Sequence, residues 1–359
     1  GDAARLARRL ADRLDGEARV HERFGTATVR WPGGTLDVAA TRRESYERSG
    51  ALPVVRTGVS VAEDLARRDF TINAIALELG PGRRRHDPFG GLGDLRRGVV
   101  RELHPASFLE DPTRIFRAAR YAHRLRFRIA PLTRRRIREA LAGGALDRIS
   151  ADRLRREIVL LLEEARPAEA VRRLDVLGVS RAVAPALERR TGASARLRRL
   201  ERLGSSSGRA TGWFGLLLAW LGPASADEAA SVAMRLGLAG DLARRLSGWP
   251  ALVAAFPRDL ARLPLSERRR AAARLGPEEI LALAVLLPPR DAAALVAAAA
   301  PEPAPLLSIG GRDLVAAGVA PGPAVGRALE RTRAALEDGR IGAADQLAFA
   351  LRAAREDSR

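Results

Sequence analysis

The feature that most constrains the fold is a change of sequence pattern near residue 105. Before it lie strand-like segments, of which Thr26–Trp31 and Thr35–Thr41, joined by Pro-Gly-Gly, are typical of a β-hairpin. From Ser107 onward the strand signals stop, and apolar residues recur at helical spacing to the end of the chain. The sequence therefore predicts an α+β N-terminal part followed by an all-α remainder.

Breaks in the helical pattern divide the remainder further. Gly204–Gly208 contains three serines and is typical of a linker, and Pro301–Pro305 is a second break. A chain of 359 residues is expected to form two to four folded units. The predicted parts are residues 1–105, 106–190, 191–304 and 305–359.

Two local patterns predict helix starts, and one predicts a loop. Ser60 with Glu63 forms a capping-box pattern. Asp111 is expected to be an N-cap with Pro112 at the first helical position. Arg42–Gly58 mixes charges with Gly and Pro without a clear period, and we expect it to be a mobile loop beside the functional site.

The charge of the chain points to a polyanionic partner. The formal net charge is +19, all 62 basic residues are arginine, and the sequence pI is about 11.5. Nucleic acid is the expected partner, and a membrane surface is the weaker alternative. Arg-rich faces such as Arg134–Arg138 could track an RNA backbone, although each alone is typical of a solvated face. A GC-rich coding bias explains part of this arginine excess.

Other classes are excluded or disfavoured by composition. The chain has no cysteine, which excludes disulfides and thiolate metal sites and is compatible with a reducing compartment. No apolar run reaches the about 18 residues of a membrane span, so no membrane partner is expected. The expected location is cytoplasmic. Oligomeric state is not predicted.

Asp111 and Arg114 are the first candidate site residues. At i and i+3 of a helix start they share a face, where a carboxylate acceptor would lie beside guanidinium donors. The pairing edges of cytosine and adenine each carry an amino donor beside a ring-nitrogen acceptor. Such a pair could favour C and A together, by roughly 1–3 kcal/mol per bidentate contact. The alternative is a helix cap with a surface ion pair.

The segment Arg67-Arg68-Asp69 with Asn73 is the second candidate. Adjacent arginines point to different sides, so one can hold phosphates while the other structures the loop. Asp69 could accept a hydrogen bond from a ribose hydroxyl. Asn73 is the only asparagine of the chain, which argues for a specific amide requirement. The alternative is a charged turn before a strand.

Asp37 and the pair Arg153 and Glu157 complete the candidates. Asp37 projects from the hairpin face opposite its apolar residues and could be a metal carboxylate, but no Asp-x-Asp occurs on a strand to complete such a site. Arg153 and Glu157 lie at i and i+4, as a surface pair or as a buttress for the base-reading helix.

Several motifs in order resemble the class II branch of the tRNA nucleotidyltransferase and bacterial poly(A) polymerase family, in the polymerase β superfamily. The resemblance covers nearly all of the chain. It rests on Arg67–Ala74, read Arg-Arg-Asp-Phe-Thr-Ile-Asn-Ala, and on Asp87–Gly91, Glu110–Arg114 with Arg117-Ala118, and Ile309–Leu314. It implies an α+β nucleotidyltransferase head followed by an all-α neck, body and tail.

The resemblance also implies roles, residue by residue. Arg67, Arg68 and Asp69, with Asn73 nearby, would contact the incoming nucleotide and its ribose. Asp111 and Arg114 would read the base, and Arg117 would face the triphosphate. Asp37 would be a catalytic metal carboxylate. Supporting positions would be Glu110, Arg120, Arg153 and Glu157.

The implied activity is addition of C, A or both to the tRNA 3′ end from CTP and ATP, with Mg²⁺ as cofactor in a two-metal nucleotidyl transfer. The implied partners are tRNA, ATP and CTP. The family's Gly-Ser turn and Asp-x-Asp pair precede the position matching Gly1. We therefore expect the head to be incomplete and the printed chain to bind nucleotide weakly without catalysing.

Two alternatives stay open. CCA-adding, CC-adding, A-adding and poly(A) polymerase activities are not separable by these motifs. A non-catalytic, Arg-rich helical RNA-binding module, with salt-sensitive binding and no nucleotide preference, is the competing class.

Overall fold

The structure is a computed structural model that describes residues 2–21, 25–45, 50, 53–188, 192–208, 211–300 and 305–356. Two compact units make up the chain. The first contains Gly1–Arg190 and Ser231–Ala239, and the second contains Thr191–Ala230 and Gly240–Arg359. An α+β region followed by helices is confirmed, whereas the division into four parts stays a prediction.

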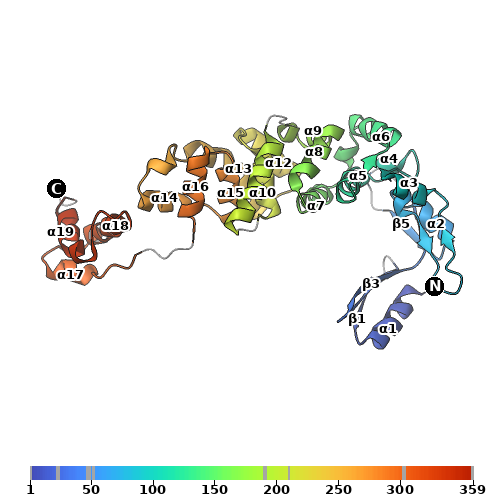
Figure 1. Ribbon diagram of the computed structural model, residues 1–359, viewed down its shortest axis with the longest axis horizontal. Coiled ribbons are helices and arrows are strands. Elements are labelled where there is room, and N and C mark those ends of the chain that lie inside the picture. The colour runs from blue at the N-terminus through green and yellow to red at the C-terminus, as the bar shows by residue number, and fades with distance from the viewer. Residues whose placement is uncertain are drawn as a thin grey trace. The chain divides into compact units, whose positions relative to one another are not determined.

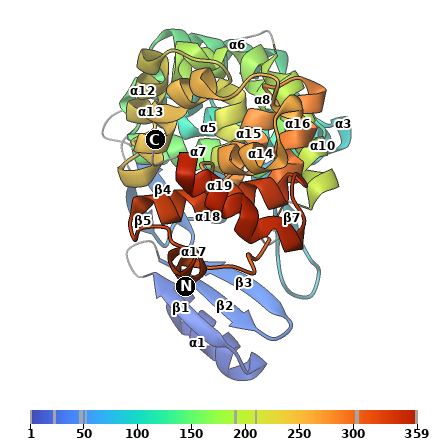
Figure 2. The same cartoon turned by 90° about the vertical axis from the view of Figure 1, so that its left-hand side faces the viewer.

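The first unit opens with a helix packed on a small sheet. Helix α1 (Ala3–Leu14) lies along one face of the antiparallel sheet β1 (Glu17–His21), β2 (Thr26–Trp31) and β3 (Gly34–Ala39) (Figures 1 and 2). Asp2 caps α1, because its side chain accepts a hydrogen bond from the backbone of Arg5. The predicted hairpin is confirmed, with Val29 opposite Leu36.

The predicted loop at Arg42–Gly58 is wrong in its described part. Strands β4 (Arg42–Ser45) and β5 (Val54–Thr57) form an antiparallel pair there. Residues 46–49 and 51–52 of the range lie outside the described residues. Strands of four residues are too short to show a period through charged positions, so pairing decided their conformation. Helix α2 (Val61–Ala66) follows, and its predicted Ser60–Glu63 capping box is confirmed.

Short elements then lead into the helices. The elements are η2 (Thr71–Asn73), β6 (Ala76–Leu77), β7 (Arg85–His86), α3 (Gly91–Arg97), β8 (Val99–Val100) and β9 (Arg128–Ile129). The expectation that strands stop at Ser107 is wrong, because β9 pairs in parallel with β8. A two-residue strand has no period of its own and forms only because a helix returns the chain to β8.

The remaining helices of the first unit pack around one core. Ile115, Phe116, Leu154 and Leu174 are fully buried in it. The elements are α4 (Ser107–Glu110), α5 (Thr113–Arg124), α6 (Pro131–Ala142), η3 (Ala145–Arg148), α7 (Ala151–Leu162), α8 (Pro167–Leu177), α9 (Val179–Val183) and η4 (Pro185–Glu188). Helix α12 (Ala226–Arg235) begins in the second unit and ends in the first.

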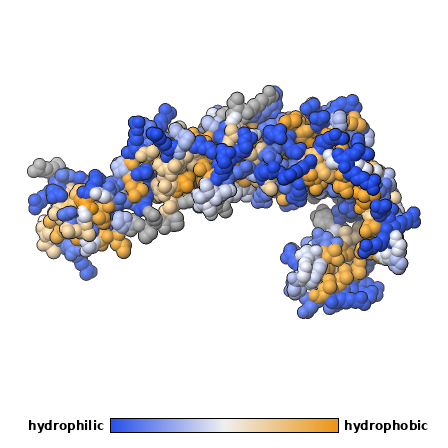
Figure 3. All heavy atoms as spheres, in the orientation of Figure 1, coloured by the Kyte–Doolittle hydropathy of each residue, from blue (hydrophilic) through white to orange (hydrophobic). Residues whose placement is uncertain are grey.

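The second unit is helical in its described residues. Its elements are α10 (Ala193–Ser207), α11 (Trp213–Leu221), α13 (Gly240–Ala255), η5 (Leu260–Arg262), α14 (Leu265–Ala272), α15 (Pro277–Ala284), α16 (Pro289–Ala298), α17 (Gly311–Ala316), α18 (Pro323–Glu337), η6 (Ala343–Asp345) and α19 (Gln346–Glu356). Trp220 and Trp249 are fully buried there. Hydrophilic residues spread over the helical elements on the face shown in Figure 3.

The linker predicted at Gly204–Gly208 is wrong. Helix α10 continues through Ser207, and the hydroxyls of Ser205 and Ser207 donate to the carbonyl groups of Glu201 and Leu203 one turn earlier. Serine can satisfy its hydroxyl within a helix in this way, so its presence does not end one. The break at Pro301–Pro305 lies outside the described residues except for its last residue. In the described part of the chain, no helix combines the length and apolar character that crossing a bilayer requires.

Candidate active site

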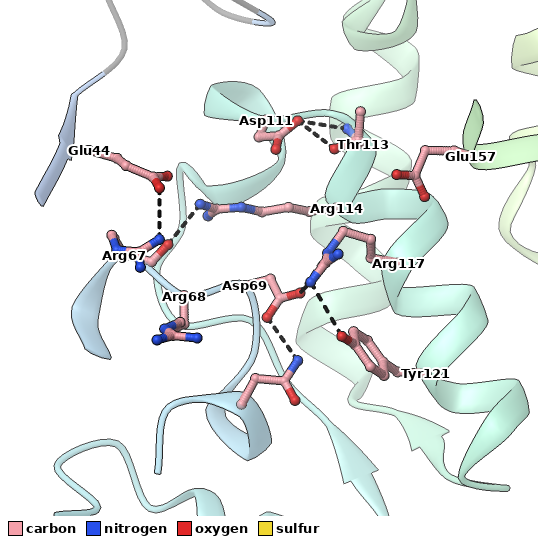
Figure 4. Close-up of a pocket in the computed structure, with 11 residues that line it drawn as sticks. Glu44, Arg67, Arg68, Asp69, Asp111, Thr113, Arg114, Arg117, Tyr121 and Glu157 are labelled. Carbon is pink, nitrogen blue, oxygen red and sulfur yellow. Dashed lines mark hydrogen bonds and ion pairs between the residues drawn. The ribbon is translucent and has the colours of Figure 1, made fainter. Parts of the chain in front are cut away.

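Most of the predicted site residues meet in one cavity of about 450 Å³ in the first unit. The end of α2, the turn before η2, the junction of α4 and α5, and α7 supply its walls (Figure 4). Cations and anions are equal in number in the lining, so the cavity is polar without being uniformly basic. Its lining consists of Glu44, Arg67, Arg68, Asp69, Asn73, Asp111, Thr113, Arg114, Arg117, Tyr121 and Glu157.

The guanidinium group of Arg67 makes its contacts with other groups of the protein. Its guanidinium lies 2.7 Å from Glu44 Oε1 and 2.9 Å from Asp64 Oδ1, and its Nε donates to the carbonyl of Arg42. Burial acts to raise the pKa of Asp64, but hydrogen bonds from Arg68 and Arg67 outweigh it and lower that pKa. Arg67 therefore ties β4 to the end of α2, as expected for the arginine that structures the loop.

The Arg68 side chain is more exposed than that of Arg67 and makes fewer contacts. Its side chain is 42% exposed, and Nη2 donates to Asp64 Oδ2 at 2.9 Å. Since one contact leaves most of its N–H groups available, Arg68 is the arginine of the pair suited to a phosphate.

Both carboxylate oxygens of Asp69 accept hydrogen bonds from other groups of the protein. Arg117 approaches its Oδ2 with Nε at 2.7 Å and Nη2 at 2.6 Å, while Asn73 Nδ2 donates to Oδ1 at 2.9 Å. Burial acts to lower the pKa of Arg117, but the charges of Asp69 and Tyr121 outweigh it and raise that pKa. Asp69 thus holds Arg117 and Asn73 in place, which differs from an open acceptor for ribose.

Asp111 caps α5 and keeps one oxygen available. Its Oδ1 accepts from Thr113 N at 3.1 Å, Thr113 Oγ1 at 2.7 Å and Arg153 Nη2 at 2.8 Å. The helix begins at Thr113, one residue later than predicted, so Pro112 takes the N-cap position, while Asp111 Oδ1 still accepts a hydrogen bond from the first helical N–H. Its Oδ2 has no partner among the described residues, and Figure 4 shows this oxygen on the side where Arg114 lies.

Arg114 is buried, with 5% of its surface exposed. Nη1 donates to Ser107 Oγ at 2.9 Å, and Nη2 donates to the carbonyl of Arg67 at 2.9 Å. Three of its five N–H groups remain without a protein acceptor in the described structure. Arg114 does not form the i,i+3 ion pair with Asp111 that the spacing suggested, because Asp111 turns one oxygen to Arg153 instead.

Arg153 and Glu157 do not pair with each other; each reaches a different partner. Arg153 donates to Asp111 and to the carbonyl of Gly50 at 2.8 Å, and Glu157 lies 3.1 Å from Arg120 Nη1 on α5. Burial raises the pKa of Glu157, against the lowering effect of Arg120. These contacts join α7 to Asp111 and to α5, and the buttress role stays a prediction.

Glu110 and Asp37 lie outside the cavity lining. Glu110 Oε2 is 3.4 Å from His104 Nε2. Asp37 is exposed on β3 and accepts a hydrogen bond from Thr28 Oγ1 at 2.7 Å. The structure therefore does not bring Asp37 to the other site residues.

One curated relative decides the family. The CC-adding tRNA nucleotidyltransferase of Deinococcus radiodurans is 34% identical over 340 residues, which are 93% of this chain and 77% of that protein. The chain belongs to the tRNA nucleotidyltransferase family.

Other matches agree with this family. The poly(A) polymerase head domain matches residues 1–101, and a domain described as the probable RNA and SrmB-binding site of polymerase A matches residues 126–190. The A-adding tRNA nucleotidyltransferase of Geobacter sulfurreducens is 44% identical over 191 residues, 52% of this chain and 22% of that protein. The chain thus spans less than a quarter of that relative's length.

Solved structures of this family share the fold. A CCA-adding enzyme without ligand has a TM-score of 0.84 at 28% identity, covering 98% of this chain and 85% of that one. The Thermotoga maritima CCA-adding enzyme complexed with tRNA has a TM-score of 0.76 at 27% identity, covering 100% and 85%. A CCA-adding enzyme with CTP has a TM-score of 0.79 at 27% identity, covering 99% and 85%.

The described residues do not complete a metal site of the kind the family resemblance implies. No three of their His, Asp and Glu side chains are grouped to hold an ion, and Asp37 faces a threonine rather than a second carboxylate.

Three lining residues of this family member were missed from the sequence. Glu44 falls in the range expected to be a loop, so nothing marked it. Thr113 directly follows the Asp-Pro start of α5, where a hydroxyl can join the cap. Tyr121 lies one turn after Arg117, whose Nη2 donates to its hydroxyl at 3.3 Å, and this i,i+4 spacing could have identified it.

Proposed function

We propose that the protein is a tRNA 3′-end nucleotidyltransferase that adds C, A or both from CTP and ATP. The carrying observation is that one cavity is lined both by Asp111, whose Oδ2 is an unused acceptor, and by the buried Arg114, which has unused N–H groups. Relatives named for CC addition and A addition, and related structures with tRNA, ATP and CTP, support the same reaction class.

The base-reading argument depends on rigidity. Arg114 is held from two sides by Ser107 and the Arg67 carbonyl, and Asp111 is held by Thr113 and Arg153. Because neither side chain can rotate without breaking these bonds, the donor and acceptor directions are set before a nucleotide arrives. An amino group beside a ring nitrogen fits this order, and a carbonyl in place of the amino group leaves Asp111 facing an acceptor.

The phosphates would lie toward Arg68, whose side chain is the most exposed of the arginines that line the cavity. Arg117 keeps its charge beside Asp69 and contributes to the positive side of the cavity. In the proposed reaction the tRNA 3′-hydroxyl oxygen bonds to the α-phosphorus and its proton passes to solvent, while the bond from the α-phosphorus to the oxygen bridging the β-phosphate breaks and releases pyrophosphate. The family resemblance implies a divalent cation; Mg²⁺ as that cation, and a cytoplasmic location, stay predictions.

Nucleotide selection tests the proposal. We expect binding of CTP and ATP to exceed binding of UTP and GTP, and Asp111→Asn to reduce this preference by roughly tenfold or more, since one bidentate contact accounts for about 1–3 kcal/mol. Asp152→Asn is the matched control, because Asp152 is 77% exposed on α7 and pairs only with Arg155 in the described structure. An unchanged preference in Asp111→Asn would refute the base-reading role.

Product assays separate the alternatives within the family. Labelled CTP and ATP are supplied with tRNA ending before the first C, after the second C, and after the final A. Incorporation at the first stage only indicates CC addition, and incorporation at the second only indicates A addition. The match to a poly(A) polymerase head makes repeated A addition to an unrelated RNA the remaining enzymatic outcome. Salt-sensitive RNA binding with neither incorporation nor a preference among nucleotides would favour the RNA-binding module.

A further inference from the structure

A second cavity in the first unit has the opposite electrostatic character. It has a volume of about 720 Å³ and is lined by α3, β8, β9, α6 and α8 (Figure 1 labels α3, α6 and α8). It shares no lining residue with the candidate active site. Six arginines line it, and no carboxylate does: they are Arg97, Arg101, Arg128, Arg134, Arg172 and Arg173.

Most of this charge is not compensated. Arg97 and Arg101 share the single carboxylate of the buried Asp94, at 2.8 and 2.9 Å. Arg128, Arg134 and Arg172 make no side-chain ion pair or hydrogen bond in the described part of the chain, and Arg173 donates only to the carbonyl of Phe127. Burial and the neighbouring charge of Arg172 lower the pKa of Arg173, and the opposing effect of Glu169 does not outweigh them.

The side chains that line the cavity restrict the class of ligand that could bind there. Between the arginines lie apolar side chains, including Val99, Ile129 and Val176, and Val176 is 54% exposed to the cavity and solvent. Guanidinium groups bind phosphate oxygens through a planar fork, and apolar walls accept the face of a base. A ligand with phosphates and bases satisfies both features, whereas an acidic peptide would not need the apolar floor.

We propose that this cavity is a second binding site for phosphate-bearing nucleotides, occupied by a segment of RNA or by a free nucleoside triphosphate. The match of residues 126–190 to a probable RNA-binding domain includes nine of the twelve lining residues, while Arg97, Val99 and Arg101 precede it. The site does not depend on the proposed function, since it uses none of the active-site residues.

The test compares two triple variants of the whole protein. R128Q/R134Q/R172Q removes three cavity charges that make no protein ion pair. R8Q/R9Q/R13Q removes three charges from exposed positions of α1 and is the matched control for net charge. Binding of a labelled single-stranded RNA is measured by fluorescence anisotropy at several salt concentrations, and binding of ATP by calorimetry.

If RNA occupies the cavity, the slope of log affinity against log salt flattens by about 2 in the cavity variant relative to the control, at about 0.7 per lost phosphate contact. If a free nucleotide occupies it, the number of ATP molecules bound per chain falls by one in the cavity variant alone. Either result supports the site and identifies its ligand as RNA or as a free nucleotide. Equal changes in both triple variants, for RNA and for ATP, would overturn it.

A third variant separates loss of binding from loss of folding. R128K/R134K/R172K keeps the three charges but not the planar guanidinium fork. The salt slope for RNA is therefore expected to stay at the wild-type value, while affinity for RNA or ATP falls less than in the glutamine variant. Thermal unfolding of all variants is followed in parallel, and R128Q and R172Q singly replace the triple variant if it does not fold. A lysine variant that loses as much as the glutamine variant contradicts a phosphate site.

Discussion

The two cavities of the first unit contain many arginines and use them in opposite ways. In the candidate active site, Arg67 and Arg117 are bound to Glu44, Asp64 and Asp69, so their charges are balanced and their positions are set. In the second cavity most arginines have no carboxylate partner in the described structure. The number of arginines in a cavity therefore does not identify its function. Arginines paired with carboxylates hold neighbouring side chains in fixed positions, whereas unpaired arginines can bind an external anion.

The largest expected change in stability comes from removing a paired arginine of the candidate active site. Arg67→Met removes the cation that Glu44 and Asp64 share, although Arg42 still contacts Glu44 and Arg68 still contacts Asp64, and these two carboxylate side chains are only 10% and 11% exposed. Removing one partner of a buried pair costs about 3 kcal/mol or more. We expect urea unfolding to show a loss of this size. A loss well below 1 kcal/mol would mean that the arginine pairs of this cavity are not structural.

Arg114→Met sharpens the comparison, because Arg114 is buried without an ion pair among the described residues. Its charge costs desolvation energy that no carboxylate offsets, so replacement by an apolar side chain is expected to change stability little. Preference for CTP and ATP is expected to fall by roughly 30-fold, or about 2 kcal/mol. A variant that unfolds as readily as Arg67→Met would place Arg114 among the structural arginines.

The pH dependence of stability is expected to differ between the two cavities. Burial raises the pKa of Glu157, which lines the first. Its folded-state pKa exceeds its unfolded value, so its contribution is fully present below the unfolded value of about 4.5 and is lost as pH rises through the folded value. Glu157→Gln should therefore gain stability relative to the wild type as pH rises through this window.

Asp94, behind the second cavity, behaves in the opposite way. Burial acts to raise its pKa, but hydrogen bonds from Arg101, Arg97 and Thr71 outweigh it and lower that pKa. Its contribution is present above the unfolded value of about 3.8 and is lost as pH falls through the folded value. Asp94→Asn should therefore cost stability at neutral pH and little in acid. Urea unfolding across pH checks both variants, and parallel profiles would contradict the assignment.

The smallest expected effect is that of Arg97→Gln. The Arg97 side chain is 60% exposed, and Asp94 keeps Arg101 and Thr71 when Arg97 is removed. An exposed ion pair contributes about 0.5 kcal/mol, so the free energy of unfolding should change by no more than that. A loss comparable to that of Arg67→Met would show that the second cavity also depends on its arginines for folding.

Much of the local structure could be predicted from residues close together in sequence. The Ser60–Glu63 capping box, the Asp111–Thr113 contact and the hairpin that begins at Thr26–Trp31 involve partners close in sequence, so their patterns are visible in the chain. The convergence of Arg67–Asp69 with Asp111 and Arg114 was also expected, but from family resemblance rather than from the spacing of these residues.

Long-range partners were not predictable in the same way. The pairing of β8 with β9 and of Arg153 with Asp111 joins residues about 30 to 40 positions apart, and nothing local specifies either. The i,i+3 and i,i+4 spacings predicted Asp111–Arg114 and Arg153–Glu157 pairs. Packing of α7 against the α4–α5 junction offered Asp111 and Glu157 other cations, and those pairs formed instead.

The sequence by itself determined the helix caps, the helical character after Ser107, the strong positive charge and the set of motif residues. These follow from contacts along a few residues or from composition, which do not require the folded chain. Only the tertiary structure decided which arginines are neutralised and which remain available, because a guanidinium finds its carboxylate across elements that folding brings together. That choice separates the balanced cavity at Arg67 and Asp111 from the arginine-lined one at Arg128 and Arg172.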